Sequence, residues 1–432
     1  MKQSIYNILF CIDNKHYLYN TLSGTYVRIS DHVYHCLETN DLNNIEDIGL
    51  QKLSKDLFLI EDNVDEYQVV YNQYMNKIYH SEEFHLTLLP TLDCNLRCWY
   101  CFEQHIEGSK MSESLKESLL IYIEQILNRK EIKNITFELF GGEPLLFFKD
   151  NVYPLLKRTK DLVDVHKKKI QLLIITNGIL LTSENIELLR EFDVFYQITI
   201  DGCRNKHNIV KKIKDKKDDS SYDLVMRNIA NLSKEPNVHI NLRINYDDHT
   251  LKHITEIISS IDTIDRSKIK IHLERVWQTL KSSNNDNVLL KNAIQKFIDK
   301  GFYVTYMNFF RKGFSCKASK INQCIISYDG KVFKCSGRNF SEDLQEGFLK
   351  EDGNIEWDKN KLDKRLSIIT FDNDKCKKCK FLPLCYGPCC QKQLEMKEDK
   401  EKTIDSLCQL NHMEMSIEEY LAFRYKAHKN IT

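Results

Sequence analysis

Short apolar runs alternate with amphipathic stretches through the middle of the chain. The apolar runs predict six β-strands, at residues 85–91, 135–140, 171–176, 194–200, 238–245 and 269–276. Helical periodicity lies between them, at residues 113–128, 183–190, 222–233, 249–261 and 288–300. Strands that alternate with helices predict parallel βαβ units, so the expected fold class is α/β. In such sheets, active sites lie at the carboxyl ends of the strands.

The first part of the chain has a different pattern. Strand-like runs occur at Asn7–Ile12, Tyr17–Tyr19 and Thr25–Ile29, and turn residues separate them. Helix-like stretches follow at about His32–Leu37 and Leu50–Asp56. A strand hairpin followed by short helices predicts a small winged-helix-like unit over residues 1–80.

The remaining pattern suggests three further segments. The alternating strands and helices occupy residues 84–305, and residues 306–410 have few long apolar runs. Residues 306–410 can therefore bury only a small hydrophobic core, so bound metal would have to hold this segment together. Residues 411–432 contain a predicted helix at Ile417–Lys426, and the charged run Lys206–Lys217 is typical of a solvated surface loop.

Composition narrows the class of protein. Of the 432 residues, 42% are hydrophobic and 29% are charged, as in ordinary globular proteins. Lysine plus arginine equals aspartate plus glutamate at 62 each, which argues against a nucleic-acid or membrane-surface partner. No apolar stretch approaches the ~18–20 residues of a membrane helix, and no signal peptide is recognisable. We therefore expect a cytoplasmic protein.

Cysteine usage points to metal. The chain has 15 cysteines, and thiols in the cytoplasm stay reduced, so a disulfide framework is not expected. Three of them, Cys94, Cys98 and Cys101, follow the first predicted strand of the alternating segment, and nine fall between residues 316 and 408. Clusters with short fixed gaps indicate metal ligation.

The first cluster has the spacing Cys-x3-Cys-x2-Cys. Cubane iron–sulfur clusters usually take four cysteine thiolates, so three ligands in one loop leave one iron open. An open coordination position is where a metal site does chemistry. The alternatives are a zinc site and an ordinary structural cluster.

This motif resembles that of the radical S-adenosylmethionine (SAM) superfamily. The resemblance implies a partial (β/α)6 TIM-like barrel over residues 84–305. It also implies a [4Fe–4S] cluster held by Cys94, Cys98 and Cys101, whose open iron binds the amino and carboxylate groups of SAM. One electron then cleaves the sulfonium and yields methionine and a 5′-deoxyadenosyl radical.

The ends of the later strands extend the resemblance. A glycine pair lets the backbone approach a ligand closely, and in this family a segment like Gly141–Pro144 binds the amine of SAM. Tyr100 corresponds to an aromatic position near adenine, and Arg243 would pair with the carboxylate. Taken singly, each residue also has a structural reading as a turn glycine, a core tyrosine or an ion pair. The implied cofactor-binding set is Tyr100, Gly141, Gly142, Glu143, Pro144, Asn177, Thr199, Asp201 and Arg243.

The downstream cysteines resemble the SPASM extension of this superfamily, which holds two auxiliary [4Fe–4S] clusters and would bring the total to three. The resemblance assigns Cys316, Cys324, Cys335 and Cys389 to the cluster nearer the barrel. It assigns Cys376, Cys379, Cys385 and Cys408 to the outer cluster. Two zinc sites of four cysteines are the alternative.

Four cysteines remain. Cys11 and Cys36 lie in apolar contexts that are typical of core residues. Cys390 is an alternative ligand in place of Cys389. Cys203 follows a strand end and is the one candidate catalytic residue, as a hydrogen donor to a substrate radical. A passive thiol is the alternative reading of Cys203.

Two features bear on the substrate. Relatives that oxidise sulfatases carry aspartate directly after the Gly-x4-Cys motif, where this chain has Ser336, so the general base of that branch is missing. The stretch from His16 to Gly24, followed by Tyr26–Ile29, resembles the leader-binding units of ribosomal peptide maturases. In those units the leader adds to an exposed sheet edge. A simple structural cap on the barrel is the alternative.

We therefore expect a peptide maturase that forms a thioether or C–C crosslink. The expected partners are a precursor peptide with a leader and a one-electron donor such as flavodoxin or ferredoxin. A peptide epimerase and a sulfatase-maturing enzyme are the alternatives among enzymes. A non-catalytic iron–sulfur electron carrier or scaffold is the alternative of another class.

Overall fold

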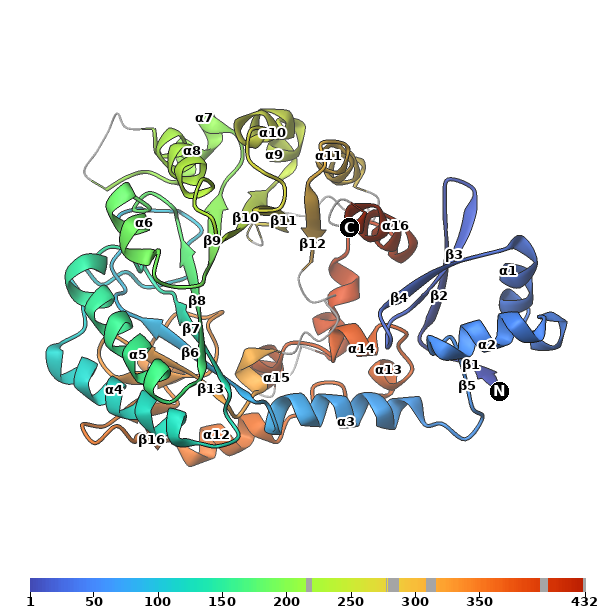
Figure 1. The fold of residues 1–432 in the computed structure, drawn as a ribbon, viewed down its shortest axis with the longest axis horizontal. Helices are drawn as coiled ribbons and strands as arrows, with labels where there is room; N and C mark the ends of the chain where they lie inside the picture. The colour runs from blue at the N-terminus through green and yellow to red at the C-terminus, as the bar shows by residue number, and fades with distance from the viewer. Residues whose placement is uncertain (215–219, 277, 279–286, 308–315, 397–402, 430–432) are drawn as a thin grey trace.

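The computed structural model describes residues 1–214, 220–276, 278, 287–307, 316–396 and 403–429. A strongly curved sheet forms the main body, and helices wrap its outer face (Figure 1). A smaller unit formed by the first 60 residues stands beside this body, and helix α3 (Glu66–Tyr79) connects the two along one edge. The cysteine-rich segment (residues 316–408) lies partly between them, with residues 374–396, and partly along the lower edge of the main body, with residues 355–366.

The curved sheet contains all six strands that the apolar pattern predicts. They are parallel and adjacent in chain order, as expected for consecutive βαβ units. The α/β fold class is therefore confirmed. The strands are β6 (Glu83–Leu89), β7 (Asn134–Leu139), β8 (Lys169–Thr176), β9 (Val194–Ile200), β10 (Val238–Tyr246) and β11 (Ile269–Arg275).

Further strands extend both ends of this sheet. β12 (Tyr303–Tyr306) pairs in parallel with β11, and β13 (Gln323–Ser327) pairs in parallel with β6. An antiparallel meander then continues from β13 through β14 (Lys331–Phe333), β15 (Gly347–Leu349) and β16 (Ile355–Trp357). The cysteine-rich segment is thus joined to the barrel by backbone hydrogen bonds, which its low apolar content did not predict.

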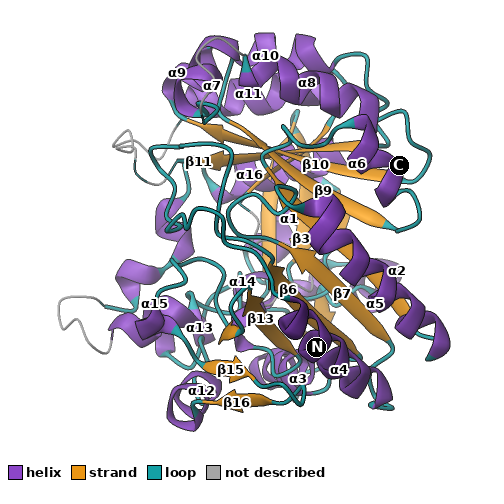
Figure 2. Cartoon of the chain, turned by 90° about the vertical axis from the view of Figure 1, so that its left-hand side faces the viewer, coloured by secondary structure: helices purple, strands orange, loops and turns teal. Residues whose placement is uncertain are grey.

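Helices cover the outer face of the sheet (Figure 2). In α4, for example, Leu119, Ile123 and Ile126 recur at helical spacing and are buried against the strands. None of the described helices is long and apolar enough to cross a membrane. The covering helices are α4 (Glu113–Asn128), α5 (Tyr153–Val165), α6 (Ser183–Leu189), α7 (Arg204–Val210), α8 (Ser221–Leu232), α9 (Asp248–Lys252), α10 (Ile254–Ile261) and α11 (Val288–Asp299).

The N-terminal unit is built on a three-stranded antiparallel sheet in the order β2–β3–β4. One face of this sheet packs on the helices of the unit through Leu18. The opposite face, which includes Phe10 and Tyr17, belongs to the same hydrophobic core as the barrel. The elements are β1 (Lys2–Gln3), β2 (Asn7–Ile12), β3 (Lys15–Asn20), β4 (Thr25–Ile29), α1 (Asp31–Glu38), α2 (Asp47–Lys55) and β5 (Leu59–Ile60), which pairs with β1.

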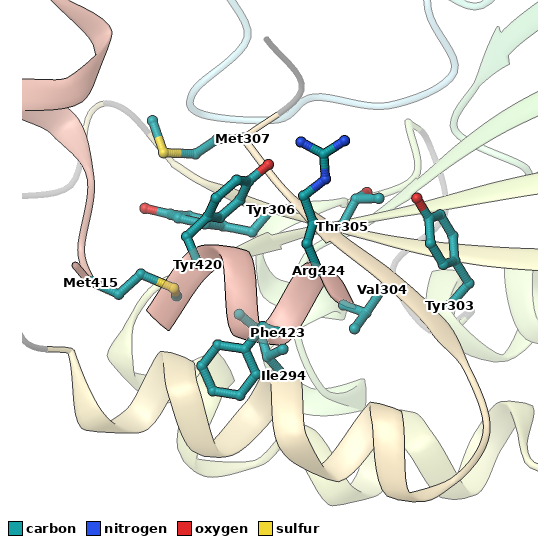
Figure 3. Close-up of a pocket in the computed structure, with 10 residues that line it drawn as sticks. All are labelled: Ile294, Tyr303, Val304, Thr305, Tyr306, Met307, Met415, Tyr420, Phe423 and Arg424. Atoms are coloured by element: carbon teal, nitrogen blue, oxygen red, sulfur yellow. The ribbon is translucent and has the colours of Figure 1, made fainter. Parts of the chain in front are cut away.

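The C-terminal helix α16 (Ile417–His428) joins the N-terminal sheet to the barrel. Its Tyr425 ring lies 4.9 Å from the ring of Tyr17 on β3, measured between centroids. On its other side, a small cavity of about 40 Å³ separates α16 from β12 (Figure 3). This volume admits a few water molecules but no cofactor, since ligand pockets measure ~300–1,000 Å³.

The cysteine-rich segment shares a hydrophobic core with α3. Phe371, Leu382 and Tyr386 pack with Val70 and Tyr74 of that helix. The expected role of metal in holding this segment together is therefore shared with ordinary hydrophobic packing. The helices of the segment are α12 (Lys359–Leu366), α13 (Asp374–Lys377), α14 (Leu382–Cys385) and α15 (Cys390–Met396).

Candidate active site

The predicted cluster loop leaves β6 at the carboxyl edge of the sheet and folds back on itself. The carboxylate of Asp93 accepts hydrogen bonds from the backbone N–H of Cys94 and of Gly108, each at 2.8 Å. Ser109 then accepts a bond from the N–H of Leu92 at 2.9 Å. These bonds satisfy backbone groups of a loop that is itself neither strand nor helix, and they hold its start and end together.

The three predicted cluster thiols differ in exposure. Cys94 is buried, Cys98 is half-buried and Cys101 is exposed. Burial raises the pKa of Cys94 to about 12, and partial desolvation by the surrounding loop raises that of the more exposed Cys101 to about 11. The neighbouring Cys98 thiol raises both pKa values further. A metal ligand must be a thiolate, so cluster assembly here releases protons.

The glycine pair after β7 packs directly on this loop. Gly141 and Gly142 both have positive φ, at 81° and 30°. A Cβ atom on Gly142 would lie 2.1 Å from the carbonyl oxygen of Asp93, so no larger residue fits. The N–H of Glu143 donates to the same oxygen at 2.8 Å. The segment Gly141–Pro144 is thereby fixed beside the cysteines.

Glu143 ties this segment to the end of β8. Its carboxylate accepts bonds from Thr176 Oγ1 at 2.7 Å and from the N–H of Asn177 at 2.9 Å. Burial raises the pKa of Glu143, and these bonds oppose that effect. Asn177 in turn donates to Asn95 Oδ1 at 2.8 Å, next to Cys94. The ends of three strands thus form one bonded group.

We expect Glu143→Ala to destabilise the fold by about 3 kcal/mol, because the backbone N–H groups of Asn177 and Leu145 and the hydroxyl of Thr176 lose a buried acceptor. Anaerobic chemical denaturation measures the free energy of unfolding. Thr176→Val is the matched control, since it removes one of these bonds and should cost about 1 kcal/mol. Equal values for the two variants would mean that Glu143 does not hold the strand ends.

A second group of residues joins the loop to β9 and β10. Tyr100 Oη donates to Asp201 Oδ2 at 2.8 Å, and Asn245 Nδ2 donates to Asp201 Oδ1 at 3.1 Å. Arg243 Nε donates to Asn245 Oδ1 at 3.1 Å. Arg243 is directly opposite Thr199 in the parallel register of β10 and β9, and both side chains are half-buried. All nine predicted cofactor-binding residues therefore lie at or near this edge of the sheet.

The structure corrects the expectation that the charged run Lys206–Lys217 is a solvated loop. The described part of that run is not a solvated loop: residues up to Val210 belong to α7, and the Lys211 side chain is 5% exposed. Its ammonium lies 3.4 Å from Asp201 Oδ2. A buried carboxylate at the strand end can compensate a buried cation, and this pairing is invisible in a run of lysines.

The sequence analysis also did not predict three other residues of the site. Asn245 had a usable signal, because it lies two residues after Arg243 and so faces the same side of β10. His207 had none: it is fully buried and its Nδ1 accepts the N–H of Asp201 at 3.2 Å. Glu103 is half-buried, desolvation by its neighbours raises its pKa to about 7, and its carboxylate accepts a hydrogen bond from the N–H of Gly142.

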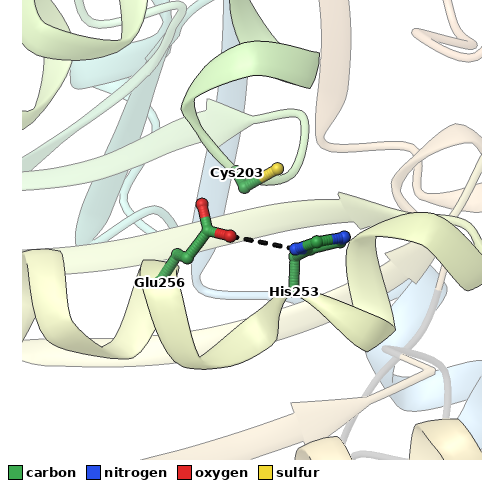
Figure 4. A group of neighbouring side chains, drawn as sticks. All are labelled: Cys203, His253 and Glu256. Atoms are coloured by element: carbon green, nitrogen blue, oxygen red, sulfur yellow. Dashed lines mark hydrogen bonds and ion pairs between the residues drawn. The ribbon is translucent and has the colours of Figure 1, made fainter.

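Cys203 lies with side chains of the outer helices (Figure 4). One ligand-type atom from each of Cys203, His253 and Glu256 falls within 4.8 Å of the others. His253 Nδ1 and Glu256 Oε1 already form an exposed pair at 2.9 Å. This surrounding favours a passive thiol, and the hydrogen-donor role of Cys203 stays a prediction.

The downstream cysteines form two groups. Cys379 and Cys408 raise the pKa of Cys376, and all three raise that of Cys385, beyond the effect of burial. This group is the one expected for the outer cluster. In the other group, burial and the neighbouring thiols of Cys389, Cys335 and Cys390 raise the pKa of Cys316 to about 12.

Cys324, which was expected in this second group, contacts a helix of the barrel. It lies on β13, where successive side chains point to opposite faces. Ile325 joins Phe333 and Phe340 on one face, whereas Cys324 is fully buried on the other. There its Sγ is 3.4 Å from Tyr122 Oη of α4. The alternation of the strand therefore turns Cys324 toward the barrel helices.

The surroundings of Cys335 fit a bound iron–sulfur group. Arg365 is buried and pairs with Glu346 and Gln391, but its Nη1 has no hydrogen-bond partner among the described residues. The positive charge of the same guanidinium lowers the pKa of the Cys335 and Cys390 thiols, which burial raises. A buried N–H without an acceptor is costly, and a cluster sulfur beside it would satisfy it.

The sequence of this region also matches a known family. Residues 88–261 match the model of the radical SAM superfamily. These residues are a radical SAM domain. Its match spans the cluster loop, the Gly141–Pro144 segment, Asp201 and Arg243. A radical SAM domain takes a [4Fe–4S] cluster and SAM, and three thiols on one loop are a fitting donor set for that cluster.

Curated relatives of the radical SAM domain extend over most of the chain. The radical SAM cyclopropyl synthase TigE of Paramaledivibacter caminithermalis is 24% identical over 423 residues, with 89% of this chain and 85% of TigE covered. A cysteine-type anaerobic sulfatase-maturating enzyme of Clostridium perfringens strain 13 is 23% identical, with 73% and 90% covered.

Solved structures share the fold. SuiB of Streptococcus suis, bound to its precursor peptide SuiA, matches with a TM-score of 0.53 at 15% identity. That match covers 94% of this chain and 99% of SuiB. The sulfatase-maturating enzyme anSMEcpe with bound AdoMet matches with a TM-score of 0.55 at 20% identity, over 80% of this chain and 98% of that one. The large parallel sheet is thus a radical SAM partial barrel.

Proposed function

We propose that this protein is a radical SAM peptide maturase, which modifies a ribosomally made precursor peptide by forming a thioether or C–C bond. One observation carries the radical chemistry. The three thiols of the cluster loop meet the Glu143–Asn177 group and the Tyr100–Asp201 group at one edge of the partial barrel. The proposal of a peptide substrate is supported by the N-terminal unit and by the relatives.

The residues of the site divide into two roles. Cys94, Cys98 and Cys101 would hold the cluster and leave one iron open for SAM, which would supply the 5′-deoxyadenosyl radical. The carbonyl oxygens of Gly141–Pro144 would accept hydrogen bonds from the amine of SAM. Arg243, with Thr199 opposite it on β9, would bind the carboxylate and ribose, and Tyr100 would contact adenine.

The N-terminal sheet is suited to bind a leader peptide. β4 pairs with β3 on one side only, and no other described strand pairs with it. Its residues are exposed or half-buried, unlike the mostly buried β2 and β3. An unpaired strand edge is a template for a further strand, so the leader adds to β4 by main-chain hydrogen bonds.

The two groups of downstream cysteines would hold the auxiliary clusters of a SPASM domain. Such clusters would accept the second electron that leaves the substrate when a new bond replaces two C–H or S–H bonds. The first electron comes from a cytoplasmic carrier such as flavodoxin or ferredoxin. Electron transfer needs clusters but no open iron, which suits sites built from several thiols.

The alternatives differ in what they require. Sulfatase maturation needs a general base where this chain has Ser336. Epimerisation needs a hydrogen donor, and Cys203 lies among His253 and Glu256 of the outer helices. The name of TigE denotes formation of a carbon ring, and SuiB is seen with a precursor peptide, so bond formation on a peptide is favoured.

The test uses the full chain, reconstituted anaerobically with iron and sulfide, together with SAM, dithionite and small peptides encoded beside its gene. We expect 5′-deoxyadenosine and a peptide product lighter by ~2 Da, the two hydrogens lost in bond formation. Arg28→Pro in β4 should weaken leader binding, because proline blocks strand pairing. It should leave deoxyadenosine formation without peptide unchanged.

Each other result selects another function. A loss of ~18 Da from a cysteine peptide indicates formylglycine, and an unchanged mass with altered stereochemistry indicates epimerisation. No deoxyadenosine from a protein with its full iron content would leave only an electron carrier or scaffold.

A further inference from the structure

Lys211 brings a positive charge into the cluster site from an element that the radical SAM motifs do not include. It follows α7 directly, and its N–H donates to the carbonyl of His207 at 2.7 Å. Its side chain is 5% exposed, and the carboxylate of Asp201 beside it is 2% exposed. A charge so far removed from water acts on its neighbours with little screening.

Backbone bonds hold Lys211 against the cluster loop. Ile213 forms an antiparallel bridge with Leu96. On either side of this bridge, the N–H of Arg97 donates to the carbonyl of Lys212 at 3.1 Å, and the N–H of Lys214 donates to that of Asn95 at 2.8 Å. The position of the ammonium relative to the cysteines is thus set by main-chain pairing rather than by a flexible loop.

The charge of Lys211 reaches all three cluster thiols. The ammonium lies 3.4 Å from Asp201 Oδ2, and the same oxygen accepts a hydrogen bond from Tyr100 Oη, a residue between Cys98 and Cys101 on the cluster loop. In keeping with this position, Lys211 lowers the pKa of Cys94, Cys98 and Cys101, against the larger effect of burial. Asp201 and Glu143 bring negative charge close to these thiols, and Lys211 is a buried cation that compensates part of it.

We propose that Lys211 is the counter-charge of the cluster held by Cys94, Cys98 and Cys101, and that it sets the reduction potential of that cluster. The inference rests on the proposed radical SAM function. It makes Lys211 a positioning residue for charge, not a ligand of the cluster or of SAM. Net charge near the sulfurs is one of the factors that determine cluster potentials.

The physical reason fixes the sign of the effect. Reduction adds one electron, supplied in the experiment by dithionite, and no proton. A nearby cation stabilises the more negative reduced state. Removing that cation should therefore make reduction harder, and removing the Asp201 carboxylate should make it easier.

The test compares Lys211→Met with Lys211→Arg, which keeps the charge, and with Lys212→Met, which removes an exposed neighbouring lysine. Each full-length protein is poised at a series of potentials without SAM, and EPR measures the reduced cluster. Subtracting the spectrum of the Cys94, Cys98 and Cys101 triple alanine variant isolates the signal of this cluster. Iron content and SAM affinity are measured on the same samples.

We expect the ratio of reduced to oxidised cluster in Lys211→Met to fall about tenfold at a fixed potential, which equals a midpoint about 59 mV lower. Lys211→Arg and Lys212→Met should match the unmodified protein. Asp201→Asn should shift the midpoint in the opposite direction. Equal iron content in all variants is part of the expected result.

Three results would overturn the proposal. An unchanged midpoint in Lys211→Met would remove the role of the charge. Weaker SAM binding with an unchanged midpoint would make Lys211 a cofactor ligand instead. Loss of iron from Lys211→Met would make it a folding residue. If the unmodified protein lacks any reducible signal beyond that of the triple variant, the radical SAM function itself fails.

Discussion

Replacing Cys94, Cys98 and Cys101 together by alanine abolishes 5′-deoxyadenosine formation and removes about four iron atoms per chain. The three thiols come from one loop, and that loop is held by Asp93 and by the Gly141–Pro144 segment rather than by the metal. We therefore expect the fold to survive the change. Iron analysis, circular dichroism and chromatography of the SAM products measure the three effects.

Cys11→Ala is the matched control for this experiment. Cys11 is an exposed cysteine on β2 of the N-terminal unit, and its thiol lies 3.1 Å from His16 Nδ1. Its removal should change neither iron content nor product formation. Deoxyadenosine at the unmodified rate from the triple variant would refute the assignment of the cluster loop.

Replacing Cys316 and Cys335 by alanine removes about four iron atoms, whereas Cys324→Ala removes none. Cys389 raises the pKa of both Cys316 and Cys335, as expected for neighbouring thiols. Cys324 instead contacts Tyr122 on the opposite face of β13. The Cys324 change should cost about 1 kcal/mol of stability through lost packing. Iron content per chain and the free energy of unfolding separate the two kinds of residue.

The outcome for Cys324 decides between two ligand sets. Iron loss from Cys324→Ala as large as that from the double variant would support the four-cysteine set expected from the family. Full iron content would leave Cys316, Cys335 and Cys389 as ligands, with Cys390 as the next thiol within reach of Cys316. Cys390→Ala in the same series then tests whether that thiol is a fourth ligand.

Most strands of the barrel could be predicted because the sequence patterns that mark them involve neighbouring residues only. The apolar runs of β9 and β10 lie on strands buried on one face by helices, so their pattern survives in the sequence. The Cys-x3-Cys-x2-Cys spacing and the Gly141–Gly142 pair are also local, since one loop and one tight turn require them. β12 was missed because a four-residue strand carries too little pattern.

Other features depend on contacts between distant parts of the chain. α16 packs between β2 and β12 and is weakly amphipathic, because it contacts neighbours on more than one side. Glu414, just before it, pairs with Arg275 and accepts bonds from Tyr246 and Asn287. Nothing near Glu414 in the sequence identifies partners from three other elements.

The sequence by itself determined the α/β class, the positions of the six parallel strands, the cysteine spacing of the cluster loop and the glycine pair after the second strand. Only the tertiary structure decided that Lys211 is buried against Asp201, that Cys324 faces α4 and that the N-terminal sheet shares a core with the barrel. The physical reason is the same in each case. Strand periodicity and turn geometry are properties of neighbouring residues, whereas the burial of one charge or thiol depends on which distant element covers it.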